Sequence, residues 1–256
     1  MPEPELPSLR YPLRRDVEWR NLTAGSSETD LSSGEETVMI TNLSDVTFSV
    51  VWISSSKEEG YIKYGVNETQ LDKEGRDVRD SFTSKGSYKA HYIETDRLEP
   101  DTTYFFEVYS GGRKYDNNGQ GYMVKTFSTL PSPPPFETRA GTITNVTDPS
   151  DWIIVFTLID DDQLGSSGSS NYISSLPDSN GSWIVTIGDA RTTDGSSYFS
   201  FSTADILQAS FLGAVKKTFD FKLSENDLEM DVSSIGRVSQ DGKVALLENY
   251  GIIKER

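Results

Sequence analysis

The single histidine, His91, limits the catalytic chemistry open to this chain. A Ser-His-Asp triad would depend on it alone, and a site with several histidine ligands cannot form. His91 lies in the run Tyr88-Lys-Ala-His-Tyr-Ile93, whose composition is typical of a sheet strand. We therefore interpret His91 as a structural strand residue, and we predict no catalytic residues and no enzyme activity.

Three consecutive aspartates, Asp160, Asp161 and Asp162, are the candidate metal ligands. They follow the apolar run 152–159, which we predict to be a strand buried on both faces. Hard oxygen ligands on loops are what Ca²⁺ requires, so calcium is the one cofactor that the sequence suggests. The spacing matches no EF-hand loop, and plainly solvated charges are the alternative.

Paired carboxylates also raise the question of glycoside hydrolysis, because two of them flanking a cleft suffice for that reaction. Nothing in the sequence predicts a cleft between two small sandwiches. An independent enzyme is therefore the third of the functions that we consider.

An N-terminal arm over residues 1–36 carries the first set of candidate partner contacts. It contains Pro2, Pro4, Pro7 and Pro12, which predicts an extended arm. It is nevertheless too apolar for a solvated linker. One interpretation is an arm packed on its own domain, and the other is a strand donated to the sheet edge of a neighbouring molecule. The contact residues would be Leu9, Tyr11, Leu13, Val17 and Trp19.

A second set of candidate contacts, Arg113 and Tyr115, lies in the Gly- and Asn-rich loop 110–119. Arg and Tyr are residues that interfaces favour. A flexible loop without a partner is the alternative.

The composition excludes several classes of function. The 256 residues suggest two domains. The net charge of −16 argues against nucleic acid, and the only local basic group is Arg10, Arg14, Arg15 and Arg20. The absence of cysteine excludes disulfides and thiol chemistry.

The same chain has no apolar stretch near the roughly 18 residues that a membrane span needs. Residues 1–5 lack the basic and apolar regions of a signal peptide. We expect a mature fragment whose export and anchoring signals lie elsewhere, with no membrane insertion in this segment.

The run Leu98-Glu-Pro-Asp-Thr-Thr-Tyr104 is the clearest structural motif. A tyrosine at such a corner buries its ring while its hydroxyl bonds to backbone a few residues upstream. Strand patterns surround it, at 48–52, 61–65, 104–109 and 122–127. Residues 38–130 therefore resemble a fibronectin type III domain of the kind seen in bacterial surface proteins and beside some secreted phosphatases.

The consecutive prolines of Leu130-Pro-Ser-Pro-Pro-Pro135 predict a semi-rigid spacer that holds two modules at a set distance. Beyond it, strand patterns occur at 140–146, 152–159, 182–187, 198–201 and 217–223, and residues 203–215 are the one candidate for a short helix. The Gly-Thr-Ile start, the Asp-Ser-Asn-Gly-Ser-Trp-Ile-Val segment and the closing Phe-Asp-Phe-Lys-Leu resemble a carboxypeptidase regulatory-like or collagen-adhesin B-type sandwich. Residues 237–247 predict a hairpin around Asp241-Gly242 or a linker.

The predicted fold class is all-β, with two immunoglobulin-like β-sandwich domains in tandem joined by a Pro-rich linker. The predicted divisions are an arm at 1–36, the fibronectin-like sandwich at 37–130, the linker at 131–136, the second sandwich at 137–235 and a C-terminal tail at 236–256.

These features together predict a non-enzymatic extracellular or cell-surface protein with a structural or adhesive role. Its partners would be other copies of itself or cell-surface proteins, and the bolder version is a filament subunit that exchanges its arm. The alternative is an accessory carbohydrate-binding or spacer module of a secreted hydrolase, which would bind glycans through aromatics such as Trp19, Trp152 or Tyr198.

Overall fold

The chain folds into two immunoglobulin-like β-sandwiches in tandem. The computed structural model describes residues 19–21, 38–115, 121–213, 217–225, 228–232, 246–248 and 252–254. Within these ranges the only helical elements are two short 3₁₀ turns, η2 (Pro149–Asp151) and η3 (Ile187–Asp189). The predicted all-β fold class is confirmed.

The first sandwich consists of two sheets. Its outer sheet has the order β1 (Trp19–Asn21), β9 (Gly121–Lys125), β7 (Thr103–Ser110), β4 (Gly60–Gly65) and β5 (Lys73–Arg76), and β8 (Arg113–Tyr115) pairs with β7. Its inner sheet has the order β2 (Met39–Thr41), β3 (Ser49–Glu58) and β6 (Tyr88–Glu94). We call these the first outer sheet and the first inner sheet.

Alternating side chains build the core between these sheets. Along β7 buried and half-exposed residues alternate from Thr103 to Ser110, as a strand with one covered face requires. The buried residues of β7 pack in the core of the first sandwich. They share this core with Phe48, directly before β3, and with Val50 and Trp52 of β3, all three of which are fully buried. The Tyr104 hydroxyl accepts a hydrogen bond from the backbone N–H of Glu99 at 2.9 Å, so the corner predicted from Leu98–Tyr104 forms.

The second sandwich also has two sheets. Its inner sheet has the order β12 (Ile173–Ser175), β11 (Ile153–Ile159), β14 (Ile206–Leu212) and β15 (Lys217–Lys222). Its outer sheet has the order β13 (Ser182–Thr186), β10 (Thr138–Thr144) and β16 (Leu228–Asp231). Aromatic residues, among them Phe156, Trp183 and Phe211, fill the core between the second inner and second outer sheets.

Two local predictions for this part of the chain need correction, and a third, the hairpin around Asp241-Gly242, lies largely outside the described residues. The candidate helix at 203–215 contains the strand β14, because its residues alternate between buried and half-buried positions between β11 and β15. The run 198–201 forms no strand, and Tyr198 makes only an isolated bridge to Arg191. The C-terminal hairpin pairs β17 (Leu246–Glu248) with β18 (Ile252–Lys254), whereas residues 237–245 of the predicted hairpin lie outside the described residues.

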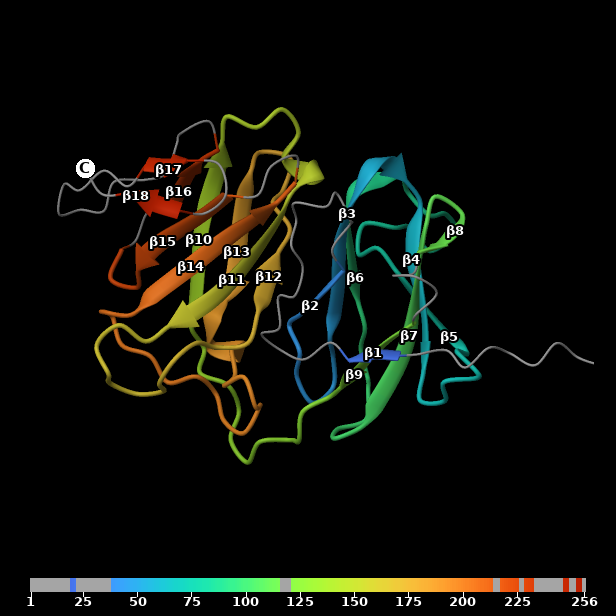
Figure 1. The fold of residues 1–256 in the computed structure, drawn as a ribbon, viewed down its shortest axis with the longest axis horizontal. Coiled ribbons are helices and arrows are strands. Elements are labelled where there is room, and N and C mark those ends of the chain that lie inside the picture. The colour runs from blue at the N-terminus through green and yellow to red at the C-terminus, as the bar shows by residue number, and fades with distance from the viewer. Residues whose placement is uncertain are drawn as a thin grey trace, which may run out of the picture.

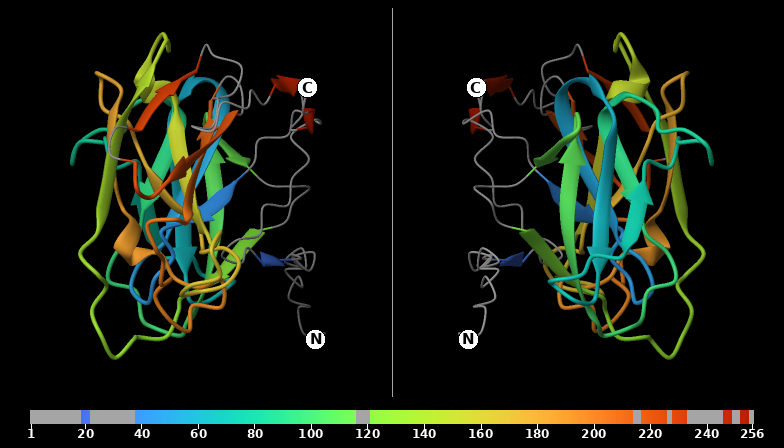
Figure 2. Two further views of the ribbon diagram at one scale, coloured as in Figure 1. Left: turned by 90° about the vertical axis from the view of Figure 1, so that its left-hand side faces the viewer. Right: turned by 90° about the vertical axis from the view of Figure 1, so that its right-hand side faces the viewer.

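The four sheets lie side by side in one stack, in the order first outer, first inner, second inner and second outer (Figure 1). Figure 2 shows this stack from its two ends, with the second sandwich nearest the viewer on the left and the first on the right. The prolines at 131–135 therefore do not hold two modules apart. Apolar contact between the two inner sheets brings the sandwiches together, which corrects the expected spacing.

None of the helices that the structure describes is long and apolar enough to cross a membrane.

Candidate functional site

The two inner sheets contact each other through both apolar and polar side chains, and this contact is the candidate site. Val51, Ala90 and Tyr92 on β3 and β6 pack against Ile153, Val155 and Leu212 on β11 and β14. Strand β11 is buried on both faces, as predicted, because one face lies in the core of the second sandwich and the other lies in this contact. We call this contact the inter-sandwich interface.

A hydrogen-bonded group connects β2 and β6 of the first sandwich with β12 of the second. Asn42 Nδ2 donates to Tyr92 Oη at 2.6 Å, and Asn42 Oδ1 accepts from the backbone N–H of Ser174 at 2.8 Å. Thr41 Oγ1 and Ser174 Oγ lie 2.7 Å apart. Asn42 has a φ of 49°, in the left-handed region that asparagine tolerates better than most residues. Asn42 thereby ends β2 and turns its amide toward β12 of the other sandwich.

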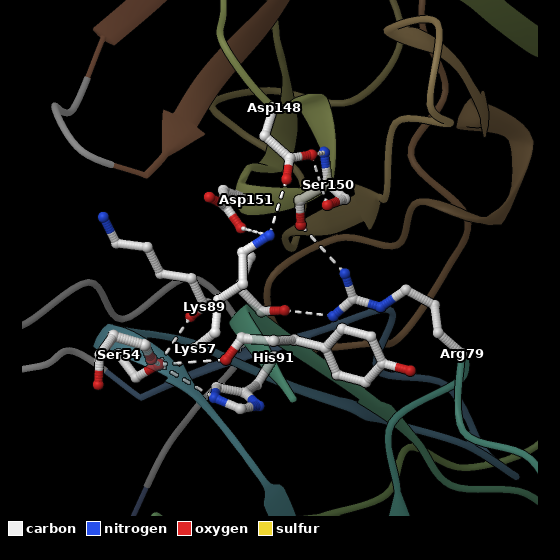
Figure 3. Close-up of polar contacts among 11 residues, drawn as sticks. Ser54, Lys57, Arg79, Lys89, His91, Asp148, Ser150 and Asp151 are labelled. Carbon is white, nitrogen blue, oxygen red and sulfur yellow. Dashed lines mark hydrogen bonds and ion pairs between the residues drawn. The ribbon is translucent and has the colours of Figure 1, made fainter. Parts of the chain in front are cut away.

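Arg79 anchors one end of the interface from the first sandwich (Figure 3). Its guanidinium makes two parallel hydrogen bonds to Asp77, at 2.7 and 2.8 Å, a geometry that fixes its plane. It donates to the backbone carbonyl of Ser150 in the second sandwich at 3.0 Å, and to that of Ala90. The ring of Tyr88 lies 3.8 Å from the guanidinium carbon. Arg79 therefore connects the two sandwiches, and its side chain is fixed by Asp77, by the carbonyl of Ala90 and by the ring of Tyr88.

Lys57 adds an ion pair at the same end, where Nζ lies 2.8 Å from Asp148 and 3.4 Å from Asp151 (Figure 3). The hydrogen bond from Lys57 lowers the pKa of Asp148 to about 2, and bonds from Ser150 add to the effect. The pKa of Lys57 is raised by its hydrogen bond to Asp148 and by the charge of Asp151. Because both side chains are well exposed, this pair contributes little stability compared with Arg79.

Arg191 anchors the opposite end from the second sandwich. Its Nη2 lies 2.9 Å from Asp45 Oδ1, and its Nη1 donates to the backbone carbonyl of Ser128 at 2.9 Å. The guanidinium carbon lies 5.5 Å from the ring centre of Phe127 and 5.3 Å from that of Tyr198. The side chain is only 3% exposed. Each sandwich thus contributes one arginine that bonds to the backbone of the other part of the chain, half-buried in the case of Arg79 and buried in the case of Arg191.

His91 lies beneath the Arg79 end of the interface and is fully buried. Its ring stacks on Trp52 with centroids 4.5 Å apart. Its Nε2 lies 3.2 Å from Ser54 Oγ (Figure 3). Its Nδ1 has no hydrogen-bond partner among the described residues, so no third group orients the ring as in a triad. Burial lowers the pKa of His91 to about 4, against the smaller opposing effects of Asp77 and Glu58. The ring is therefore neutral at pH 7, consistent with a structural role.

The structure brings only two of the three predicted metal ligands together. One oxygen from each of Asp160, Asp162 and Asp205 lies within 4.8 Å of the others. Asp161 instead forms an ion pair with Lys222. Asp205 is fully buried and accepts hydrogen bonds from the backbone N–H groups of Asp161 and Ser202. Oxygen donors of this kind suit Ca²⁺, and calcium binding stays a prediction.

The predicted partner contacts lie in the first outer sheet or outside the described residues. Trp19 is in β1, which pairs with β9 of its own chain, whereas Leu9, Tyr11, Leu13 and Val17 lie outside the described residues. Arg113 is exposed on β8, and the backbone of Tyr115 pairs with Val108.

Sequence reasoning missed the residues that hold the interface, chiefly Asn42, Arg79 and Arg191. Isolated polar residues in loops give no periodic signal. The one available signal was the apolar run of β11, which requires a covering layer on each face. Nothing in the sequence identified the first inner sheet as that layer.

Comparisons with known proteins define no family for this chain. No family model matches it, and no curated protein matches it. Among solved structures, the FN1-FN3 domains of chicken CNTN1 match with a TM-score of 0.24 and 10% identity, covering 76% of this chain and 65% of that one. A pullulanase from Anoxybacillus sp. LM18-11 matches with a TM-score of 0.21 and 7% identity, covering 72% of this chain and 25% of that one. This chain thus spans less than two thirds of either, and we draw no inference about function from them.

Proposed function

We propose that this chain is a non-enzymatic structural module of an extracellular or cell-surface protein, which acts in spacing, adhesion or assembly. The observation that carries the proposal is the inter-sandwich interface. Domains in one chain move relative to one another unless their interface is large and apolar. Here an apolar centre, a hydrogen-bonded group and two arginines, of which Arg191 is buried, couple the sandwiches, which suits a part that must keep its shape.

Rigid coupling is the first testable consequence. We expect both sandwiches to show one common rotational correlation time in ¹⁵N relaxation measurements on the full chain. The variant Ala90→Glu buries a charge in the interface and is expected to separate the two correlation times, because Ala90 is fully buried there. The matched control Lys89→Glu, on the same strand, should leave them equal. Distinct correlation times in the unmodified chain would contradict the proposal.

Surface location is the second consequence. An antibody against the purified chain is expected to label intact cells of the source organism without permeabilisation. Staining that appears only after permeabilisation would refute an extracellular role. A cytosolic protein of the same organism serves as the control for cell integrity.

The alternative, an accessory carbohydrate-binding or spacer module of a secreted hydrolase, finds less support in its proposed contacts. Trp152 is 8% exposed and packs in the second core. The guanidinium of Arg191 lies against the ring of Tyr198. Trp152 is therefore not open for stacking on a sugar, and Arg191 occupies one side of the Tyr198 ring. A signal on glycan arrays would revive this alternative.

The bolder version of the proposal is a filament or surface-assembly subunit whose N-terminal arm pairs with a neighbouring copy. Its support is the position of β1 at a sheet edge, where strand addition is a common mode of recognition.

A further inference from the structure

Five asparagines begin the three-residue pattern Asn-X-Ser/Thr, in which X is any residue except proline. They are Asn21, Asn42, Asn67, Asn145 and Asn180. This pattern is the acceptor sequence of N-linked glycosylation, and a match is meaningful where the asparagine lies on a surface loop of an exported protein. The side chain of Asn21 lies outside the described residues, so the structure bears on the other four.

Asn67 meets the structural condition on the turn between β4 and β5. Asn67, Glu68 and Thr69 are all exposed. The Oδ1 atom of Asn67 accepts hydrogen bonds from the backbone N–H of Thr69 at 3.0 Å and from the Thr69 hydroxyl at 2.9 Å. These bonds stabilise the turn through the amide oxygen alone. They leave Nδ2, the atom to which a glycan is attached, without a hydrogen bond in the part of the chain that the structure describes.

Asn180 meets the same condition in the second sandwich, on the turn that leads into β13. Asn180 and Ser182, the first and third residues of the pattern, are both exposed. Asp178 Oδ1 fixes the turn by accepting from the backbone N–H groups of Asn180 and Ser182 at 2.8 and 2.9 Å. Gly181 between them has a φ of 83°, which glycine adopts without strain. The turn is therefore held by its backbone, and the amide of Asn180 takes no part in it.

Asn42 carries the same pattern in a place that excludes a glycan. Its Nδ2 donates to Tyr92 Oη at 2.6 Å and to Ser174 Oγ at 3.2 Å. Tyr92 and Ser174 are both buried, and Ser174 belongs to the other sandwich. A sugar on this nitrogen would have to lie between the two sandwiches. Glycosylation of Asn42 is therefore incompatible with the inter-sandwich interface.

Asn145 differs from both cases. It is exposed, but its Nδ2 donates to Asp231 Oδ1 at 2.8 Å. The nitrogen that a glycan would modify is thus engaged within the second sandwich. We therefore do not include Asn145 among the acceptors.

We propose that Asn67 and Asn180 are N-glycosylated in the exported protein, one on each sandwich, and that Asn42 is not. The donor is an oligosaccharide linked to a polyprenyl diphosphate. In the transfer, Nδ2 of the asparagine forms a bond to C1 of the first sugar while the bond between C1 and the diphosphate oxygen breaks. The diphosphate leaves with the electron pair of that bond, and the amide nitrogen loses one proton to solvent. This inference rests on the proposed extracellular location, because the modification is one of exported proteins.

A glycan at Asn67 also has a local consequence for the surface of the first sandwich. The preceding residue, Val66, is 60% exposed, which places an apolar side chain directly beside the acceptor. A glycan is bulky and solubilising. At Asn67 it would shield Val66 from neighbouring molecules in a chain that has no disulfides.

The test is glycopeptide mapping by mass spectrometry of the chain purified from its source organism. The peptides that contain Asn67 and Asn180 are expected to be heavier than their sequences by one oligosaccharide each, with the sugar located on the asparagine by fragmentation. The peptide that contains Asn42 is expected to have the mass of its sequence. An unmodified Asn67 or Asn180 would overturn the inference, and so would a glycan on Asn42.

Variants made in the same organism assign the modification to the pattern. Thr69→Ala keeps Asn67 but removes its acceptor sequence, so the mature chain should lose the mass of one glycan. Thr69→Ser should restore that mass. The matched control is Thr83→Ala, which removes another exposed threonine of the first sandwich outside any such pattern and should leave the glycan mass unchanged. A glycan that persists on Thr69→Ala would contradict the assignment.

Failure of this test is distinct from failure of the proposed function. The antibody labelling of intact cells reports the location of the chain whether or not it carries sugar. Labelled intact cells together with unmodified Asn67 and Asn180 would refute the glycosylation alone. Labelling only after permeabilisation would refute the extracellular location itself.

Discussion

Replacement of Arg191 by methionine is expected to lower the free energy of unfolding by about 3 kcal/mol, a typical cost of removing one partner from a buried ion pair. The side chains of Arg191 and Asp45 are 3% and 19% exposed, so the carboxylate left behind is largely shielded from water. The substitution also leaves the backbone carbonyl of Ser128 without its bond to the guanidinium. Urea unfolding followed by Trp fluorescence measures the change.

Arg76→Met is the matched control for this experiment. Arg76 also lies close to a carboxylate, 2.8 Å from Glu74, but its side chain is 44% exposed. Because exposed pairs contribute at most about 1 kcal/mol, this control should change stability by much less. Equal effects of the two substitutions would show that Arg191 is not an anchor of the interface.

Acidification is expected to destabilise the fold through His91 by up to about 3 kcal/mol, from the difference between its two pKa values. The ordinary pKa of histidine is 6.5, whereas burial holds the pKa of His91 at about 4 in the folded chain. Between these values the unfolded chain binds a proton that the folded chain does not. The stability contribution is therefore complete above pH 6.5 and is lost as the pH falls from 6.5 to about 4.

The variant His91→Gln isolates this effect, since it keeps a polar, neutral side chain beside Ser54. The free energy of unfolding of both proteins, measured by urea titration from pH 7.5 to 4, should differ in slope only below pH 6.5. Carboxylates titrate in both proteins, so their contribution cancels in the difference. Parallel curves over the whole range would contradict a depressed pKa for His91.

Much of the fold could be predicted because its signals are local. The corner at Leu98–Tyr104 requires only a turn and a buried ring, and the hydrogen bond from Glu99 forms as expected. The strand prediction failed at β14, where residues 203–215 favoured a helix. Pairing with both β11 and β15 decides that segment, and neither neighbour is adjacent in the sequence.

The candidate site could be predicted only in part, for a related reason. Asp160 and Asp162 are close in sequence and lie close together in space, whereas Asp205 joins them from the start of β14. Asp161 also follows β11, yet it pairs with Lys222 on β15. Which side chains lie together at one end of the sandwich depends on which strands are neighbours in the sheets. The order of residues along the chain does not specify these neighbours.

The all-β, acidic and thiol-free character of the chain follows from composition, alternation and turn residues, because these act over short distances. The stacking of the two sandwiches does not follow from them and is a property of the folded chain. That arrangement depends on the match between the two inner sheets, on the face of each that points away from its own core. Val51 and Tyr92 lie on one of these faces, and Ile153 and Val155 lie on the other. It also depends on Arg79 and Arg191, which find their partners 71 and 146 residues away along the chain. Contacts at such separations follow from the packing of whole sheets, which no local pattern specifies.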